Sequence, residues 1–283
     1  ADQINKSPAA RKIIKQVKYF TAEANTYRQL AAEESYQLGL RELQKNTRAS
    51  AISAYNHFIN CNSLITNYKD VNLKIEEALE IGTLIVVFER AALPNNYQFT
   101  ADFFYNNVEA EITKKNRNKF IQFVSSQDAY TYNIHPNQVV VFEFDEFMVG
   151  NIRESVNTKE FKKDSIVVGK ISLDNTKKNV YGTVKAQYSE YKREVISYGI
   201  LSVKIINPES NHIIDHKKFP GEFVWISSWA DYKGDERALT KRQLNLTKNK
   251  PLPVPPAQDL FIEMTKPLFS QVVSYLDYYF KKY

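Results

Sequence analysis

Two carboxylates on one predicted strand have the spacing that acid–base chemistry needs. Glu143 and Asp145 lie two residues apart in the alternating stretch Asn137 to Val149, so their side chains share a strand face and stand about 6 to 7 Å apart. That separation suits the carboxylate pair of an inverting glycosidase. The same pattern is typical of the polar end of an amphipathic strand, where a neighbouring Lys185 or Lys204 pairs with the acids. The spacing alone supports both interpretations, and the second is the expected one.

The other residue types that catalyse reactions or hold cofactors occur in patterns that favour structural roles. His212 and His216 share one strand face but stand too far apart to hold zinc without a third ligand. The single cysteine, Cys61, falls at a small-residue position of a predicted helix, where burial makes a thiol inert. The chain has no Gly-rich phosphate loop and no G-x-S-x-G motif. We therefore expect no catalytic residue, no metal site and no cofactor.

The composition is that of a folded chain with a basic balance. Of 283 residues, 43% are hydrophobic and 25% are charged, as in globular proteins. The 38 Lys and Arg residues exceed the 32 Asp and Glu residues, and the net charge of +6 favours anionic surfaces but falls short of a dedicated nucleic-acid binder. No apolar run approaches the roughly 20 residues of a transmembrane helix.

The first residues indicate export. Ala1-Asp2-Gln3 is what signal-peptide cleavage, or trimming behind a lipid-modified cysteine, would leave. A cloning boundary accounts for the same residues, so both explanations stay open. Under the first, we expect the periplasm or the periplasmic face of the outer membrane, with peripheral or lipid-anchored attachment.

The first 82 residues have the spacing of helices. Apolar residues recur at steps of three and four, beginning with Ile13, Ile14, Val17 and Phe20. The same stretch carries a basic face of Arg11, Lys12, Lys15 and Lys18, for which a solvated surface is the expected role.

One part of this region resembles a tetratricopeptide repeat. Leu38-Gly39 on a first helix, and Ala54, Phe58 and Cys61 on a second, match the small and aromatic positions of that repeat. The predicted turn between them, Gln44 to Ser50, is about three residues longer than usual. An ordinary helical hairpin is the alternative, and either module would serve packing or partner binding.

After Gly82 the pattern changes to strands. We expect a strand at Thr83 to Phe88, a helix at Thr100 to Lys115, a strand at Lys119 to Val124 and a longer strand at Asn137 to Val149. Alternation in the last strand places Val140, Phe142, Phe144 and Met148 on one face and Val139, Val141 and Phe147 on the other.

The second half predicts an antiparallel meander followed by a helix. After a polar, Lys-rich connection at 151–179, whose middle alternates from Ser165 to Leu173, we expect strands at Val180 to Tyr191, Val195 to Ile206, His212 to Phe219 and Phe223 to Trp229. A Pro-rich linker at 251–256 then leads to a helix at Gln258 to Phe280, which Pro267 should kink. The predicted fold class is α+β: a helical, tetratricopeptide-like module (1–82) packed on an α/β domain (83–283) with a long antiparallel meander and a C-terminal helix.

The order of these elements resembles the curli-export lipoprotein family. The likeness rests on the strand Thr83 to Phe88, on Asn118 to Val124, on Gln138 to Glu146 and on Tyr198 to Asn207 running into His212 to Phe219. The whole chain is similar to exported Bacteroidetes-type envelope proteins that join a tetratricopeptide-like module to such a domain. Paired hairpins form a pore in the curli-export family, but 151–179 is too polar to supply the lipid-facing band of such a pore.

These observations favour a non-catalytic scaffold or adaptor subunit of an outer-membrane-associated envelope assembly, of the secretion or outer-membrane biogenesis type. We expect envelope proteins as partners and no nucleic acid. Two alternatives stay open: a carbohydrate- or peptidoglycan-interacting enzyme that uses Glu143 and Asp145, and a self-assembling ring of the curli-export type. The candidate partner-binding residues are Tyr27, Tyr36, Tyr55, His57, Trp225 and Trp229.

Overall fold

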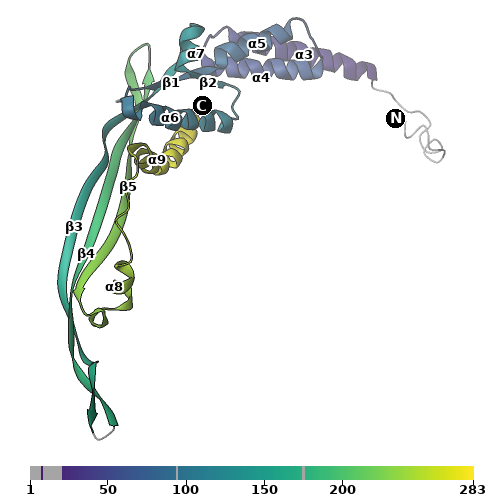
Figure 1. Ribbon diagram of the computed structural model, residues 1–283. Helices are drawn as coiled ribbons and strands as arrows, with labels where there is room; N and C mark the ends of the chain where they lie inside the picture. Colours follow the sequence, from purple (N-terminus) through teal and green to yellow (C-terminus); the bar gives the residue numbers. More distant parts are fainter. Residues whose placement is uncertain (1–7, 9–20, 94, 174–175) are drawn as a thin grey trace. The chain divides into compact units, whose positions relative to one another are not determined.

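The computed structural model describes residues 8, 21–93, 95–173 and 176–283 (Figure 1). Within these residues the chain forms two compact units: one from the segments up to Val86, Asn116–Val124 and Tyr283, the other from Val87–Lys115 and Ser125–Lys282. Two predicted features, the apolar stripe of Ile13, Ile14, Val17 and Phe20 and the basic face of Arg11, Lys12, Lys15 and Lys18, lie outside the described residues.

Helices and one five-stranded sheet make up both units, so the predicted α+β class is confirmed. The described helices are α3 (Thr21–Leu43), α4 (Arg48–Leu64), α5 (Val71–Gly82), α6 (Asn95–Lys115), α7 (Ser126–Thr131), η1 (Glu236–Ala238), α8 (Lys241–Leu246) and α9 (Ala257–Phe280). The strands are β1 (Leu84–Arg90), β2 (Ile121–Ser125), β3 (Gln138–Leu173), β4 (Thr176–Asn207) and β5 (His212–Gly234), in the sheet order β2-β1-β3-β4-β5.

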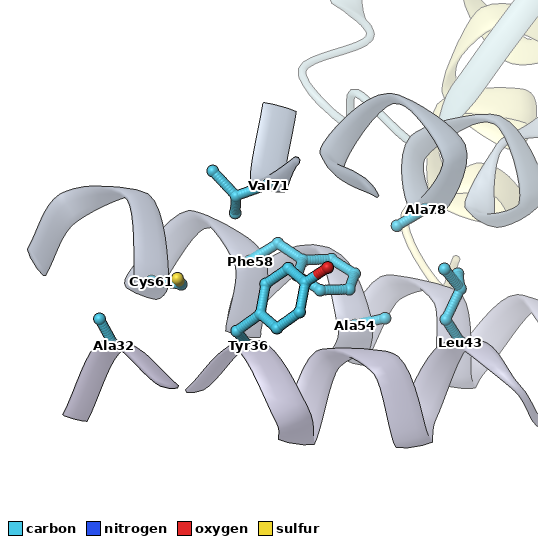
Figure 2. Close-up of a cluster of buried hydrophobic side chains, with 8 residues drawn as sticks. All are labelled: Ala32, Tyr36, Leu43, Ala54, Phe58, Cys61, Val71 and Ala78. Atoms are coloured by element: carbon cyan, nitrogen blue, oxygen red, sulfur yellow. The ribbon is translucent and has the colours of Figure 1, made fainter. Parts of the chain in front are cut away.

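The first unit is built on close contact between α3 and α4. The ring of Phe58, fully buried, lies directly over Gly39 of α3, and a Cβ at that glycine would stand 2.5 Å from the ring. Tyr36 meets Phe58 edge to face at 5.9 Å between ring centroids, and Cys61 completes the cluster (Figure 2). The predicted burial of Cys61 is confirmed, and burial raises the pKa of its thiol.

The turn between α3 and α4 is shorter than predicted. It covers 44–47 rather than Gln44 to Ser50, because Ser50 already belongs to α4. Thr47 and Ser50 form a reciprocal capping box in which the Thr47 side chain accepts from the Ser50 amide at 3.2 Å and the Ser50 hydroxyl accepts from the Thr47 amide at 3.1 Å. This arrangement satisfies two otherwise unpaired backbone donors of the helix N-terminus.

In the second unit, α6 and α9 cover one face of the sheet. Phe142 of β3 stacks on Phe88 of β1 and on Tyr105 of α6, with ring centroids 5.9 and 5.4 Å apart. The α9 helix approaches β5 closely at Gly221, where a Cβ would lie 2.7 Å from the Met264 carbonyl oxygen. The helix continues through Pro267.

A β-bulge changes the predicted faces of β3. The pairing with β4 shifts between Phe144 and Glu146, so the extra residue, Asp145, reverses the alternation that follows. Phe147 therefore joins Phe144 on the covered face, with ring centroids 6.0 Å apart, and Met148 moves to the opposite face. The prediction that placed Met148 with Phe144, and Phe147 opposite them, was wrong for this reason.

The meander is antiparallel as predicted, but its strands are longer and fewer. The polar stretch 151–179, predicted to be a connection, forms most of the outer half of β3 and the start of β4. The strands predicted at Val180–Tyr191 and Val195–Ile206 are one strand, β4, and those on either side of Pro220 are one strand, β5. Pro220 is tolerated because β5 is the last strand of the sheet, where a missing N–H costs no ladder bond.

We expect Gly39→Ala to lower the free energy of unfolding of the first unit by about 1 to 2 kcal/mol, because overpacking against Phe58 outweighs the helix propensity that alanine gains. Urea unfolding followed by the helical circular dichroism signal measures the change. Gly169→Ala is the control, since a Cβ there meets nothing within 4 Å, and it should alter stability by less than about 0.5 kcal/mol. An unchanged midpoint for Gly39→Ala would show that the Phe58 ring can move aside.

Candidate interaction surface

The paired carboxylates lie on the sheet face opposite α9 and are each bound by a lysine. Glu143 Oε2 accepts from Lys204 Nζ at 2.6 Å, and Asp145 Oδ2 lies 2.5 Å from Lys218 Nζ. The bulge at Asp145 also removes the simple two-residue spacing from which an acid–base pair was considered. Cross-strand ion pairing, with Lys204 as one predicted partner, therefore accounts for both acids.

The two strand histidines lie in different surroundings. His216 Nε2 and the Oγ of Ser202, which is fully buried, form a hydrogen bond of 2.7 Å across β4 and β5. His212 is the first residue of β5 and pairs with Asn207. Among the described residues, no three His, Cys, Asp or Glu side chains come together as metal ligands would.

The predicted partner-binding residues of the helical unit separate into surface and core. Tyr27 is 72% exposed on α3, whereas Tyr36 is only 7% exposed and belongs to the core. Tyr55 packs edge to face on Phe120 at 5.2 Å and has the Lys119 ammonium 4.0 Å above its ring, while His57 is half-buried. Tyr36 is thus corrected from a surface residue to a core residue, because Asp70 satisfies its hydroxyl inside the unit.

A polar cluster at the end of the α4–α5 connection fixes that loop to α3. Glu33 accepts from Lys69 Nζ at 2.5 Å and from the Tyr68 hydroxyl. The Lys69 ammonium also lies 4.8 Å from the ring centroid of Tyr36 and 5.2 Å from that of Tyr68. Lys69 has a left-handed backbone, with φ of 49°. These contacts hold the loop in a conformation that a lysine otherwise disfavours.

The same cluster shifts the pKa of its acids. Hydrogen bonding from Lys69, then from Tyr68 and Gln37, lowers the pKa of Glu33 from 4.5 to about 2. The Tyr36 hydroxyl lowers the pKa of Asp70, and that bond together with burial raises the pKa of Tyr36 to about 12. Both carboxylates are therefore held in their charged form.

We expect the first unit to lose stability in acid because of this cluster. A depressed folded-state pKa contributes stability that is present above the unfolded value, 4.5 for Glu33, and lost as the pH falls toward about 2. In Glu33→Gln the acid limb of thermal stability against pH, followed by circular dichroism, should be shallower, with the Asp70 contribution remaining. Glu34→Gln, at the exposed neighbouring position, is the control. Equal acid limbs in both variants would contradict the assignment.

In three cross-strand rows, alternate side chains of the predicted aromatic strand lie on one face of the sheet. The register aligns Ile152 with Val195 and Trp225, Glu154 with Arg193 and Ser227, and Val156 with Tyr191 and Trp229. Tyr191 and Trp229 stack at 5.6 Å with an interplanar angle of 4°, and the Arg193 guanidinium lies 5.5 Å from the Trp229 ring centroid. Trp225 and Trp229 are both half-buried. They are therefore neither fully buried core residues nor fully exposed docking residues.

The Pro-rich segment is fastened to this face. The Leu252 amide donates to Ser227 Oγ at 3.2 Å, and the Leu252 carbonyl accepts from Arg193 Nη1 at 3.1 Å. Arg193 is itself fixed by Glu154, with Nε and Oε1 2.6 Å apart. Residues 251–256 are therefore a bound strap as well as a linker to α9.

We expect Ser227→Ala to loosen the strap, because it leaves the Leu252 amide without its acceptor and costs about 1 kcal/mol locally. Trypsin should then cut after the exposed Lys248 about fivefold faster, whereas Lys250 is protected by the following proline. Ser228→Ala changes the adjacent side chain and should keep the original rate. Equal cleavage of the two variants, measured by mass spectrometry over time, would argue against the strap.

Beyond β5, β3 and β4 continue as a two-stranded ribbon (Figure 1). The last β4–β5 pair is Ala186 with Gly234, whereas β3 and β4 remain paired out to Leu173 and Thr176. This outer ribbon exposes apolar side chains amid lysines, namely Val168, Ile171, Val180 and Tyr181. The sequence showed alternation from Ser165 to Leu173 and a strand from Val180, but not that they pair as one ribbon, because a segment with neither face buried gives a weak strand signal.

None of the described helices combines the length and apolar composition needed to cross a membrane. No family model matches the chain, and no curated protein matches it by sequence. The tetratricopeptide and curli-export resemblances thus gain no support from these comparisons.

Two solved structures share a distant likeness. A neuraminyllactose-binding hemagglutinin homolog from Helicobacter pylori has 12% identity and a TM-score of 0.32, over 69% of this chain and 83% of that one. A minor lipoprotein from Acinetobacter baumannii has 9% identity and a TM-score of 0.26, over 68% and 90%. Values this low establish neither a common fold nor a common activity.

Proposed function

We propose that this chain is a non-catalytic scaffold or adaptor subunit of an assembly at the outer membrane of the cell envelope, and that the outer ribbon of β3 and β4 (163–184) is its docking element. The ribbon is the observation that carries the proposal. Ile166 and Val184 at its base pack on the small cluster at Ala238 and Leu239, but farther out the described residues place no third strand or helix against the hairpin. A two-stranded hairpin of that kind is marginally stable in water, so packing within the described chain does not explain its length. Exposed apolar side chains at its end are typical of a surface that another molecule covers.

The polar sites support a binding role rather than catalysis. The carboxylates considered for acid–base chemistry have lysine partners, and the buried Ser202 is the residue that His216 engages. The outer ribbon, by contrast, has exposed aromatic and β-branched residues of the kind that anchor protein interfaces. Tyr27 of α3 is a second exposed position for partner contact.

The envelope location is part of this proposal. Envelope proteins are therefore the expected partners, with peripheral or lipid-anchored attachment to the membrane.

A photocrosslinking amino acid at Tyr181 in cells should capture a discrete envelope protein. The same amino acid at Leu73, which is as exposed (67% against 63%) but lies in the helical unit, is the matched control. Replacing residues 167–181 with Asn-Gly joins the paired residues Ile166 and Gly182 through a hairpin turn and keeps Ile166 packed on the small cluster at Ala238 and Leu239. This variant should keep its thermal unfolding midpoint and lose co-purification of the partner from solubilised envelopes.

Recovery of the intact protein alone, from the soluble fraction and without a Tyr181 crosslink, would contradict the scaffold proposal. Equal crosslinking at Tyr181 and Leu73 would contradict the role of the ribbon.

A further inference from the structure

The face that carries Tyr191 and Trp229 continues outward as an uncovered polar surface. Its next rows are Thr158 with Ser189 and Asp231, Glu160 with Gln187 and Lys233, and Lys162 with Lys185. We call these eight residues the distal face. Apart from the half-buried Ser189, all of them are exposed.

The opposite side of the same strands is core. Val184, Ala186 and Tyr188 alternate with the exposed residues of β4 and pack against Ala238 and Leu239 next to η1. This cluster fixes the backbone that presents the distal face. The rows are therefore held in register by a small core, which reaches only the base of the outer ribbon, at Ile166 and Val184.

The charges of the distal face are arranged unfavourably for the chain alone. Lys162 and Lys185 are directly opposite each other, and like charges in that position destabilise a strand pair. Glu160 lies between them at 3.7 and 3.8 Å, and Lys233 is in the neighbouring row. Two ammonium groups thus share one carboxylate, and their side chains are more than half exposed: 55% for Lys162 and 59% for Lys185.

An open hollow of about 440 Å³ lies at this surface and is lined by Thr158, Glu160, Lys185, Gln187 and Lys233 of the distal face, together with Lys159 and Ala186. Next to it, the Thr158 and Ser189 hydroxyls are hydrogen-bonded at 2.9 Å, and the Tyr191 hydroxyl donates to Asp231 at 3.1 Å. The stacked Tyr191 and Trp229 rings close this end. The surface thus carries cations, hydroxyl-binding groups and aromatic rings in successive rows.

We propose that the distal face binds an anionic polysaccharide. The lysine rows match carboxylate, sulfate or phosphate groups, the Asp231, Ser189 and Gln187 side chains match sugar hydroxyls, and the Tyr191–Trp229 stack offers apolar edges for a sugar ring. An extended polymer suits the site because the rows repeat every two residues along the strands, about 6.8 Å apart. This site is independent of the envelope assembly proposed above and uses residues outside the 163–184 ribbon, with Lys162 and Lys185 next to its base.

The probe is dextran sulfate, with neutral dextran as the matched uncharged polymer. Retardation of the native protein in gels that contain each polymer gives apparent dissociation constants. Lys162→Gln/Lys185→Gln should weaken dextran sulfate binding at least about tenfold, which corresponds to about 1.4 kcal/mol. Lys163→Gln/Lys178→Gln removes the same charge from the opposite face of the same two strands, at residues that do not line the hollow, and should change binding less than about twofold.

A second readout tests the aromatic row. In Trp225→Phe, Trp229 is the remaining tryptophan, and its fluorescence should change on saturation with dextran sulfate but not with dextran. Each variant is first checked for an unchanged thermal midpoint, and the Gln substitutions lie at exposed positions where folding is preserved.

Several results would overturn the proposal. One is equal loss of binding in the two double variants, which would show that binding depends on overall charge and not on the distal face. Another is the absence of dextran sulfate binding at physiological salt. A third is face-dependent binding of anionic phosphatidylglycerol vesicles or oligothymidine in place of dextran sulfate, which would assign the face to a lipid surface or a nucleic acid.

Discussion

The continuous antiparallel pairing of β3 with β4 is the constraint on which the second unit depends. The ladder runs from Val139 and Ile206 to Leu173 and Thr176, interrupted by four register shifts. In the outer ribbon the inward-facing backbone groups pair across the ladder and the outward-facing groups are open to water, so the strands can leave the core without burying unpaired amides. The exposed side chains of the outer residues then have few packing constraints within the described chain.

The pairing also determines which face of the sheet is covered at each point along β4. Between residues 186 and 205, β4 has no irregularity against β5, so its odd-numbered residues all face one side. Near the core that side lies under α9, as the close approach at Gly221 shows, and farther out the strap through Leu252 lies on it. Beyond the strap the cover changes sides: Leu239, with Leu244 and Leu246 of α8, packs against the even-numbered residues. The odd side is left open at the distal face as a direct result.

The sequence predicted the parts of the structure in which one face is buried. Phe142 and Phe144 are buried on one face of β3, so apolar residues alternate with others in the sequence there. The buried face of α9 likewise appears in the sequence as an apolar stripe. The bulge at Asp145 had no local signal, since an extra residue is recognised only against its partner strand. Tyr36 was misplaced because its hydroxyl is satisfied by Asp70, 34 residues away. Of the predicted partner-binding residues, Trp229 lies at the end of the distal face and its role there stays a prediction; the lysine rows were not predicted. The alternation of Val184, Ala186 and Tyr188 with polar residues was the available signal, and it was assigned to a separate, shorter strand.

The charge distribution follows the same division between core and extension. Residues 159–185 contain seven lysines and three acids, a net charge of +4 out of +6 for the whole chain. At physiological ionic strength a charge acts over about 8 Å. A partner that approaches residues 159–185 therefore interacts with the charges of this stretch and with few charges elsewhere on the chain. Concentrating lysines on two paired strands costs stability through repulsion between neighbours such as Lys162 and Lys185. The backbone ladder, and the small core under Tyr188, tolerate that cost. The positive charge concentrated at residues 159–185 is therefore a better guide to partners than the net charge of the whole chain.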